Sequence, residues 1–493
     1  MTLSWLSLAP TAIVILIAIG THSINKAFLC GILLASLIAT HASAIQSITL
    51  IATHAYTQIT DPDTILLYLF LICIATMAII ITKTGCGAAF TQKMSGYMRT
   101  KRRVEASSVA FSFLMSVDDY LSILSVGHVM RLLTDTFGIS RLRLAYLVHS
   151  LAGPLVILMP ISSWVATITN QLYTAGVHTG PQALMYDDPF TVYLHTLPYM
   201  FYSLLLIVSI FFVIGNRIKL GTMDINSYVE DKNTEPLATK GSLVGLFAPL
   251  GALLGIFIGG TLLAPGNTFL VMFIAGLLSL LIAFGHALHE KILSPSAFPH
   301  LVVEGFNLMK SALITIFLAS ILALFLRENL QTGLFLAQMV KTATALHLLP
   351  FIFFCLSLAC AIATGSAWGT FSLMISIAIP MLTSLVGNAM LAAQQVPLLY
   401  PILGGIFSGA VCGDHISPFS ETTVMTATST QTNPLQHAHS QFFYALPVIV
   451  GSAVAYFSCG YLMHMGYWAQ ALIPLSIGAC ASGLCITLMK NKD

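Results

Sequence analysis

Apolar stretches of about twenty residues recur along nearly the whole chain and alternate with short polar segments. Each is long enough to cross a hydrocarbon core of roughly 30 Å as a helix. The pattern predicts an all-α polytopic membrane protein with about 11 transmembrane helices. The predicted crossings are residues 5–21, 27–47, 64–82, 144–175, 190–214, 243–263, 268–286, 305–326, 398–430, 440–464 and 468–489.

Two further apolar stretches, 104–130 and 349–378, have polar centres and predict re-entrant hairpins. Basic residues cluster on both sides of the first, at 83–103 and 131–143, and the positive-inside rule places both clusters in the cytoplasm. This stretch must therefore enter and leave by the same face, with the polar run 116–120 at its tip. Two arms of about twelve residues reach roughly 18 Å, about half the bilayer.

The placement of basic residues orients the whole chain. Of its 20 Lys and Arg, only Arg327 and Lys341 fall on the outer side of this threading. The amino terminus is then outside and the carboxyl terminus, with Lys490 and Lys492, is cytoplasmic. Only 8% of residues are charged and 57% are hydrophobic, whereas soluble domains carry roughly 25% charged residues. We expect a multi-pass protein of the cell (inner) membrane, with the lipid bilayer as its main partner.

Two segments of the chain resemble each other and predict an internal repeat. Residues 83–94 resemble 331–339, and 160–164 has a loose counterpart in 417–421. The first copy begins with a helix running inward and the second with one running outward, as in many transporters with inverted repeats. Chance similarity between Gly-rich apolar segments is the alternative. The predicted organisation is N-terminal scaffold helices at 1–63, a first repeat at 64–214, a cytoplasmic linker and connecting helices at 215–304, a second repeat at 305–464 and a C-terminal helix at 465–493.

Few acidic side chains fall within the predicted membrane region. Among 18 acidic residues these are Asp118, Asp119, Asp414 and Glu421. A carboxylate is costly there unless it faces a wet cavity, a cation or a proton path. The adjacent Asp118 and Asp119 resist ionising together, so one of them can hold a proton or a cation. Alternatively, one of the pair only caps the start of a hairpin arm.

The second hairpin carries hydroxyl groups and glycine instead of charge. Thr364, Gly365, Ser366 and Thr370 lie at its centre. Hydroxyl and carbonyl oxygens are hard ligands suited to Na+, and helix amino termini at such a break attract anions. Small residues of this kind also serve close helix packing, which is the alternative.

The densest polar run, 413–423, lies inside an apolar segment and is interrupted by Pro418. Unwound backbone at membrane depth is tolerated only where it is buried or lines a cavity. The alternative is a surface loop. Candidate ion or proton groups here are Asp414, His415, Ser417, Ser420, Glu421 and Thr422.

The runs 116–127, 160–164, 364–370 and 413–423 resemble the four signature stretches of the NhaC-type Na+/H+ antiporter family, which also includes organic-acid and amino-acid antiporters. The resemblance covers roughly 60–465. It implies an ion-transporter superfamily fold with scaffold and transport domains, two opposed hairpins and an elevator-type movement. The site residues that it implies are Asp118, Asp119, Thr364, Ser366, Asp414, Ser417 and Ser420.

The chain departs from the family pattern at two positions. His149 stands where the family usually has Asp, and Glu421 stands where it usually has Asp before two threonines. The predicted function is Na+(cation)/H+ antiport at Asp118, Asp119 and Asp414. Loss of a carboxylate at 149 keeps open the alternative of a Na+- or H+-coupled transporter of a small organic acid or amino acid. Channel and intramembrane enzyme functions fit less well, since paired hairpins suit alternating access and adjacent aspartates do not flank a scissile bond.

The expected partners and ligands follow from this reading. We expect transported Na+ and H+ but no cofactor, no nucleic-acid partner and no structural transition metal. Elevator transporters are often dimers, so a homodimer is an option by analogy of fold. His437 and His439 are expected to be loop or interface residues. The predicted ion- or substrate-binding residues are Asp118, Asp119, His149, Ser162, Thr364, Gly365, Ser366, Thr370, Asp414, His415, Ser417, Ser420, Glu421 and Thr422, with Asp118, Asp119, Asp414 and Ser417 as candidate Na+ ligands.

Overall fold

A computed structural model describes residues 5–94, 96–180, 183–221, 241–264, 266–341, 346–387 and 391–489. Within these ranges the chain is helical and has no β-strand, only isolated bridges such as that between Val177 and Met185. Within the predicted cytoplasmic linker and connecting helices at 215–304, the polar stretch 222–240 lies outside the described residues.

The two predicted repeats contain the same order of elements. Each has a long helix, a short helix, a hairpin of two helices, a second broken pair and further helices. The first series is α4 (Pro62–Lys83), α5 (Cys86–Met94), α6 (Lys101–Leu114), α7 (Asp119–Thr136), α8 (Arg141–Leu158), α9 (Ser163–Thr174), α10 (Pro189–Thr196) and α11 (Phe201–Gly215). The second is α14 (Phe298–Leu324), α15 (Thr332–Lys341), α16 (Leu349–Thr364), α17 (Ala367–Val386), α18 (Leu399–Ile416), α19 (Glu421–Thr430) and α20 (Pro434–Tyr461).

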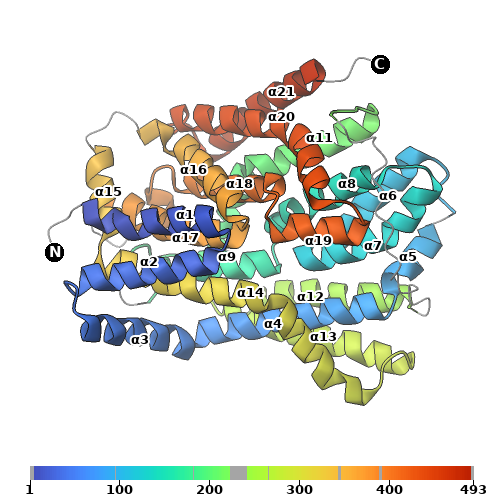
Figure 1. Ribbon diagram of the computed structural model, residues 1–493, viewed down its shortest axis with the longest axis horizontal. Helices are drawn as coiled ribbons and strands as arrows, with labels where there is room; N and C mark the ends of the chain where they lie inside the picture. Colours follow the sequence, from blue (N-terminus) through green and yellow to red (C-terminus); the bar gives the residue numbers. More distant parts are fainter. Residues whose placement is uncertain are drawn as a thin grey trace.

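Local sequence fixes where these helices begin and end. At the start of α4 the Asp61 carboxylate accepts a hydrogen bond from the Thr64 amide at 2.8 Å, and Pro62 occupies the first turn, where no amide donor is needed. Lys83 lies in the last turn, near the negative end of the helix dipole. In Figure 1, α4 and α14 run in opposite directions along the same side of the molecule.

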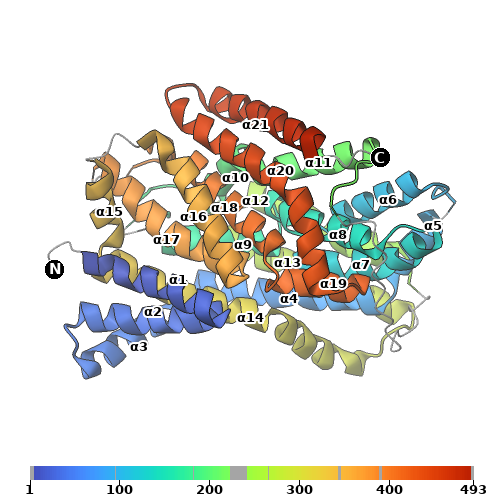
Figure 2. The same ribbon diagram turned by 45° about the horizontal axis from the view of Figure 1, so that its top comes forward.

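The remaining helices flank this core. They are α1 (Ala9–Thr21), α2 (Ile24–Ala39), α3 (Ala44–Thr60), α12 (Leu243–Leu263), α13 (Thr268–His289) and α21 (Tyr467–Met489). The broken pairs lie in the middle of the molecule, with α4, α12, α13 and α14 along one side and α20 and α21 along the other (Figure 1). Figure 2 shows α16 lying against α18, so the second hairpin packs directly on the second broken pair.

Among the described residues, nine helices are long and apolar enough to cross a membrane, or ten if α10 and α11 count as one span bent by 47°. The chain is therefore a multi-pass membrane protein. The sequence predicted about 11 crossings. The difference comes partly from α1 and α2, which have only 13 and 16 residues.

The threading leaves residues 48–63, which contain no Lys or Arg, as an outer loop between the predicted crossings 27–47 and 64–82. This prediction is wrong, because α3 occupies most of that range. The helix buries polar Ser47 and His54 and exposes apolar Ile48 and Ile59, a pattern that suits contact with lipid. The hydroxyls of Thr49 and Thr53 bond to carbonyls four residues earlier in the helix.

The predicted spans 144–175 and 398–430, each with an internal proline, are divided into two helices. Pro160 and Pro418 lie in the breaks between α8 and α9 and between α18 and α19. Proline lacks the amide hydrogen that a continuing helix requires. The hairpin arms are also longer than about twelve residues: α6, α7, α16 and α17 have 14, 18, 16 and 20 residues.

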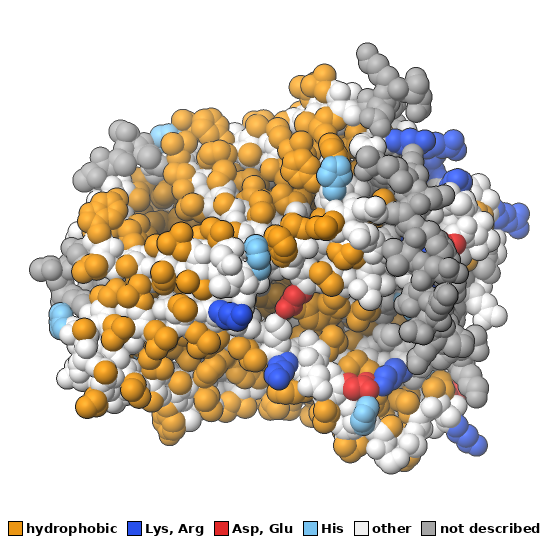
Figure 3. All heavy atoms as spheres, in the orientation of Figure 1, with side chains coloured by type: hydrophobic (Ala, Val, Ile, Leu, Met, Phe, Trp, Pro, Cys, Tyr) orange, Lys and Arg blue, Asp and Glu red, His pale blue; other side chains and the backbone are white. Residues whose placement is uncertain are grey.

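The surface is mostly apolar, as lipid contact requires. Figure 3 shows hydrophobic side chains over most of one face and Lys and Arg side chains gathered mainly towards the end that holds α5 and α6. The opposite end of this face shows no Lys or Arg. Exposed apolar residues such as Phe211, Leu278 and Leu472 lie on helices that flank the core.

Candidate functional site

The first hairpin is interrupted between α6 and α7, where Asp118 and Asp119 lie. Asp118 is the N-cap of α7, and its carboxylate accepts hydrogen bonds from the Leu121 amide at 2.9 Å and the Ser163 hydroxyl at 2.7 Å. The prediction that one of the pair acts as a cap is confirmed, and the capping residue is Asp118. Its bond to Ser163 also ties this break to the break between α8 and α9.

Asp119 differs sharply from its neighbour. It is fully buried, and neither carboxylate oxygen has a hydrogen-bond partner of good geometry among the described residues. Electrostatic interactions reach it from Asp118, the Trp164 indole and Asp414. A buried carboxylate without partners is unfavourable as a bare charge, so this group requires a proton or a cation.

The break between α8 and α9 is organised by serine side chains. Ser162 is the N-cap of α9: its hydroxyl accepts from the Val165 amide at 3.2 Å and donates to the Val156 carbonyl at 2.8 Å. The Ser163 amide donates to the Val117 carbonyl at 3.2 Å. Ser162 is therefore occupied in shaping the break, while Ser163, which was not predicted, joins the two breaks of the first repeat.

In the second hairpin, α16 ends at Gly365, which has a φ of +64° that favours glycine. Ser366 caps α17 by accepting from the Gly369 amide at 3.2 Å, and the Thr364 hydroxyl accepts from the Ser366 amide at 3.2 Å. The buried Thr370 hydroxyl has no hydrogen-bond partner of good geometry among the described residues, although it interacts with the Cys360 thiol. This break is uncharged, as predicted.

Two tryptophans connect the halves of the site. The rings of Trp164 on α9 and Trp368 on α17 lie 5.4 Å apart between centroids. Both indole N–H groups are buried without a hydrogen-bond partner of good geometry in the part of the chain that is described. The breaks thus enclose indole donors as well as the Asp119 carboxylate, and the Trp164 indole interacts with that carboxylate without forming a hydrogen bond of good geometry. Indole donors suit an acceptor oxygen on water or on a substrate.

Asp414, near the end of α18, is a bonded carboxylate. It accepts from the Ser420 hydroxyl at 2.5 Å and from the Thr422 hydroxyl at 2.6 Å. Ser420 caps α19, and the Ser417 hydroxyl donates to the Ile362 carbonyl at 2.9 Å. The side chains of this break therefore hold one another in place and anchor it to α16.

A hydrogen-bonded chain leaves Asp414 through Thr422. The Thr422 hydroxyl lies 3.0 Å from His149 Nε2, and His149 Nδ1 lies 3.0 Å from Nε2 of His437. All these side chains are buried. His415 lies beside this chain, with its ring 4.8 Å from that of His149 and its Nδ1 3.2 Å from the Tyr202 hydroxyl.

The prediction that His437 is a loop or interface residue is wrong. It is fully buried on α20, next to His149. His149 and His437 are 288 residues apart in the sequence, so the residues around His437 give no indication of this contact. His439, two residues on, is exposed and contacts Phe443.

Glu421 lies apart from Asp414, at an open edge of the site. Its carboxylate accepts from the Tyr120 hydroxyl at 2.7 Å and the Ser311 hydroxyl at 2.9 Å. A pocket of about 120 Å³ adjoins it, between the α16–α17 break and the turn from α1 to α2. Ser23 and Asn25 of that turn contribute to its polar lining.

The predicted residues therefore lie at several neighbouring helix breaks and do not form one coordination sphere around a single ion. The described residues contain no group of three or more His, Cys, Asp and Glu side chains arranged to hold a metal ion together. Asp118, Asp414 and Ser417 already have partners, which leaves Asp119 as the carboxylate with free acceptor capacity.

Residues 155–461 match the model of the Na+/H+ antiporter family. This range covers more than half of the chain and includes α9, the second hairpin and the whole of the second broken pair. The chain belongs to the Na+/H+ antiporter family. It is accordingly a secondary transporter that exchanges cations for H+, and the polar breaks described above lie in a protein that moves ions.

Relatives agree with this family. An uncharacterised protein of Haemophilus influenzae is 27% identical over 92% of this chain and 91% of its own length. The malate-2H+/Na+-lactate antiporter of Bacillus subtilis is 29% identical, but over only 21% of this chain and 20% of its own. The fold is similar to that of the YdaH transporter of Alcanivorax borkumensis, with a TM-score of 0.61 and 13% identity over 86% of this chain and 90% of that one. The family match implies transport, and the structural neighbour shows the same fold.

Proposed function

We propose that the protein exchanges Na+ for H+ at Asp119, which binds the two cations in alternation. The observation that carries this proposal is the buried Asp119 carboxylate, whose two oxygens have no hydrogen-bond partner of good geometry among the described residues. A proton or Na+ relieves the same unfavourable charge, so binding of one displaces the other. Competition at one carboxylate is sufficient to couple the two fluxes in opposite directions.

Asp414 supports this role at a distance. Its charge acts on Asp119, and two hydroxyl donors hold its own carboxylate in one orientation. An unprotonated Asp414 makes a second negative charge at Asp119 less favourable and so favours cation binding there. The Asp118 carboxylate also contributes negative charge beside Asp119, but its oxygens already accept hydrogen bonds as the cap of α7.

We assign a proton path to the chain from Asp414 through Thr422 and His149 to His437. Each step is a hydrogen bond of 2.6 to 3.0 Å between groups that can exchange a proton. Neutral imidazole donates from one ring nitrogen and accepts at the other, so two adjacent rings can pass a proton along. His149 therefore replaces the family's usual aspartate with a different proton-carrying group.

The movement that exposes the site is proposed to be of the elevator type. In this scheme the two hairpins are re-entrant and the two series of helices form an inverted repeat. The outside position of the amino terminus, the cytoplasmic carboxyl terminus and the inner membrane as location belong to the same proposal. Figure 3 supports this orientation, because Lys and Arg gather towards one end of the molecule.

A second candidate is antiport of a small carboxylate coupled to Na+ or H+. Two observations favour it: the name of the partial relative from Bacillus subtilis and the polar pocket beside Thr364 and Ser366. The amino end of α17, capped by Ser366, would receive the carboxylate of such a substrate. Neither candidate requires a cofactor, and a homodimer is proposed only by analogy with elevator transporters.

Transport by the purified protein in proteoliposomes tests both candidates. Vesicles with an acidic interior and a pH-sensitive dye should alkalinise internally when Na+ is added outside, and Asp119→Asn should remove the response. Glu290→Gln, at an exposed position after α13, is the matched control. Absence of a response to Na+ or Li+, combined with a response to malate or lactate, would replace the first candidate by the second. Absence of every response would contradict both.

A further inference from the structure

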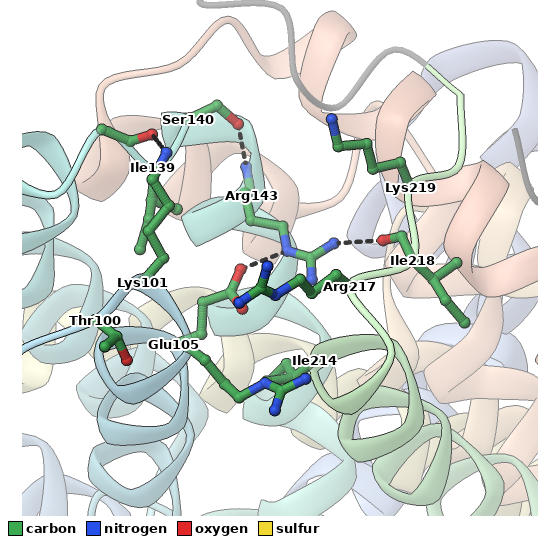
Figure 4. A pocket seen from close by; sticks show the side chains of 12 residues that line it. Thr100, Lys101, Glu105, Ile139, Ser140, Arg143, Ile214, Arg217, Ile218 and Lys219 are labelled. Atoms are coloured by element: carbon green, nitrogen blue, oxygen red, sulfur yellow. Dashed lines mark hydrogen bonds and ion pairs between the residues drawn. The ribbon is translucent and has the colours of Figure 1, made fainter. Parts of the chain in front are cut away.

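A second polar pocket lies away from the carboxylate site, at the end of the molecule where basic residues gather. It has a volume of about 500 Å³. The first turn of α6, the turn between α7 and α8, the start of α8 and the segment after α11 surround it (Figure 4). The ion site shares none of the residues that line this pocket.

The lining carries a strong excess of positive charge. Its basic residues are Lys101, Arg102, Arg143, Arg217 and Lys219, and Glu105 is its one acidic residue. Five positive charges and one negative charge leave a net charge of four. Arg143 and Glu105 form an ion pair at 2.8 Å, while both Arg143 and Arg217 point towards the centre of the group in Figure 4.

Hydrogen bonds hold several of these cations without neutralising them. Lys101 donates to the Gly138 carbonyl at 2.8 Å, and Arg102 donates to the carbonyl of Gly215. Arg143 donates to the Ile218 carbonyl at 3.2 Å. Carbonyl oxygens satisfy donors of Lys101 and Arg102 but leave their positive charges in place, while the charge of Arg143 is paired with Glu105, so the pocket is preorganised for an anion.

The backbone adds to the same potential. Thr100 and Ser140, the N-caps of α6 and α8, both line the pocket, so the positive ends of two helices are directed at it. Arg217 adopts a φ of +52°, which is uncommon for a residue with a side chain and turns the segment after α11 towards the pocket.

Membrane topology alone does not account for this arrangement. The positive-inside rule requires basic residues near one membrane face, and solvated side chains satisfy it. Here Arg143 is only 8% exposed, and its charge lies within a pocket shared by three helices. Glu105 balances one of these charges, and the basic residues that remain around the buried Arg143–Glu105 pair favour the binding of a further anion.

We propose that this pocket binds a phosphate group. Guanidinium groups match phosphate oxygens in pairs, and a pocket of this size accommodates one phosphate with bound water. An anionic phospholipid of the membrane and a free phosphate ion both offer this chemistry. Phe211 and Val208, which are 54% and 60% exposed, precede the pocket-lining Ile214 by about one and two turns of α11 and provide an apolar surface on which acyl chains can lie.

Lipid binding to the purified full-length protein tests the proposal independently of transport. Native mass spectrometry would compare phosphatidylglycerol with diacylglycerol of the same acyl chains, and wild type should retain the first but not the second. Arg102→Gln combined with Arg217→Gln should weaken phosphatidylglycerol binding about tenfold or more. The exposed pair Lys93→Gln and Lys291→Gln, which removes the same charge elsewhere, should change it less than about twofold.

Inorganic phosphate provides the second arm, with thermal stability as the measurement. Phosphate should raise the melting temperature of wild type more than chloride does, and the Arg102 and Arg217 double variant should lose this difference. If phosphatidylglycerol does not compete with the phosphate effect, the ligand is a soluble phosphate. Arg217→Lys keeps the positive charge and should retain most binding of phosphatidylglycerol and of phosphate. Its retained binding would show that the double variant loses binding through lost charge and not through misfolding. Equal phosphatidylglycerol binding by both double variants, with no effect of phosphate, would overturn the proposal.

Discussion

The breaks of the two repeats contain similar residues but treat their carboxylates in opposite ways. In the first, Asp118 is bonded as a cap and the adjacent Asp119 is buried without partners of good geometry among the described residues. In the second, two hydroxyls donate to Asp414, and the hairpin break has no charge. Asp119 lies in the first hairpin break and Asp414 at the break between α18 and α19, so the acidic residues of the two series differ in place as well as in chemistry, and hydrogen-bond donors decide which one needs a cation.

The largest effect should come from Asp119→Asn. An amide neither takes up a proton near neutral pH nor compensates a bound cation, so Na+-driven H+ exchange should fall by about a hundredfold or more. Internal alkalinisation of proteoliposomes measures this, with Glu290→Gln as the control. Exchange within twofold of wild type would place the ion site on another group and remove the contrast between the two breaks.

A smaller loss, of about tenfold, is expected for Asp414→Asn. The amide keeps one oxygen to accept a hydrogen bond, but its nitrogen cannot accept from the second of Ser420 and Thr422. Initial rates at several Na+ concentrations would separate weaker binding from slower turnover. If this variant lost as much exchange as Asp119→Asn, the two carboxylates would act as one unit and not in separate roles.

His149→Gln should reduce exchange by roughly threefold to tenfold. Glutamine can still bond to Thr422 but does not pass a proton on to His437. His437→Gln should give a similar loss, and the double variant should be no slower than either single variant, because one path is interrupted in both cases. Additive losses in that cycle would show that the two histidines do not share a path.

Asp118→Asn should have the smallest effect. Asparagine caps helices about as well as aspartate and still accepts from the Leu121 amide, and the single Ser163 hydroxyl can turn to accept from the new amide nitrogen, so exchange and melting temperature should remain near wild type. Asp118→Ala removes the cap and should lower the free energy of unfolding by about 0.5 to 2 kcal/mol. Thermal unfolding in detergent measures the stability of the two variants, and a parallel transport assay measures their exchange. Loss of exchange in Asp118→Asn, at normal stability, would make Asp118 a transport group.

Much of this asymmetry lies beyond what a sequence can predict. The polar breaks themselves were predictable, since Pro418 and the Asp118-Asp119 pair interrupt long apolar runs. Which aspartate caps α7 depends on where the helix begins to within one residue and on Ser163, 45 positions later. Local patterns do not report such contacts.

The histidine pair and α3 illustrate the same limit. His437 contacts a residue 288 positions earlier, and nothing in the sequence around it distinguishes a buried partner from a loop residue. Residues 48–63 were expected as a loop between two crossings, yet most of them form α3. Ser47, His54 and Gln58 of this helix are buried on the protein side, and the local sequence does not show which surface they contact.

The short turn between α1 and α2 has a consequence for how selectivity can change. His22 stacks on Phe419 at 4.0 Å, and Ser23 and Asn25 line the pocket beside Glu421. This turn belongs to neither repeat and bears none of the carboxylates. Exchanging residues 22–25 between relatives would therefore alter which solute fits the pocket while leaving the ion chemistry intact, which makes the turn a natural place for evolution or protein engineering to produce new specificities.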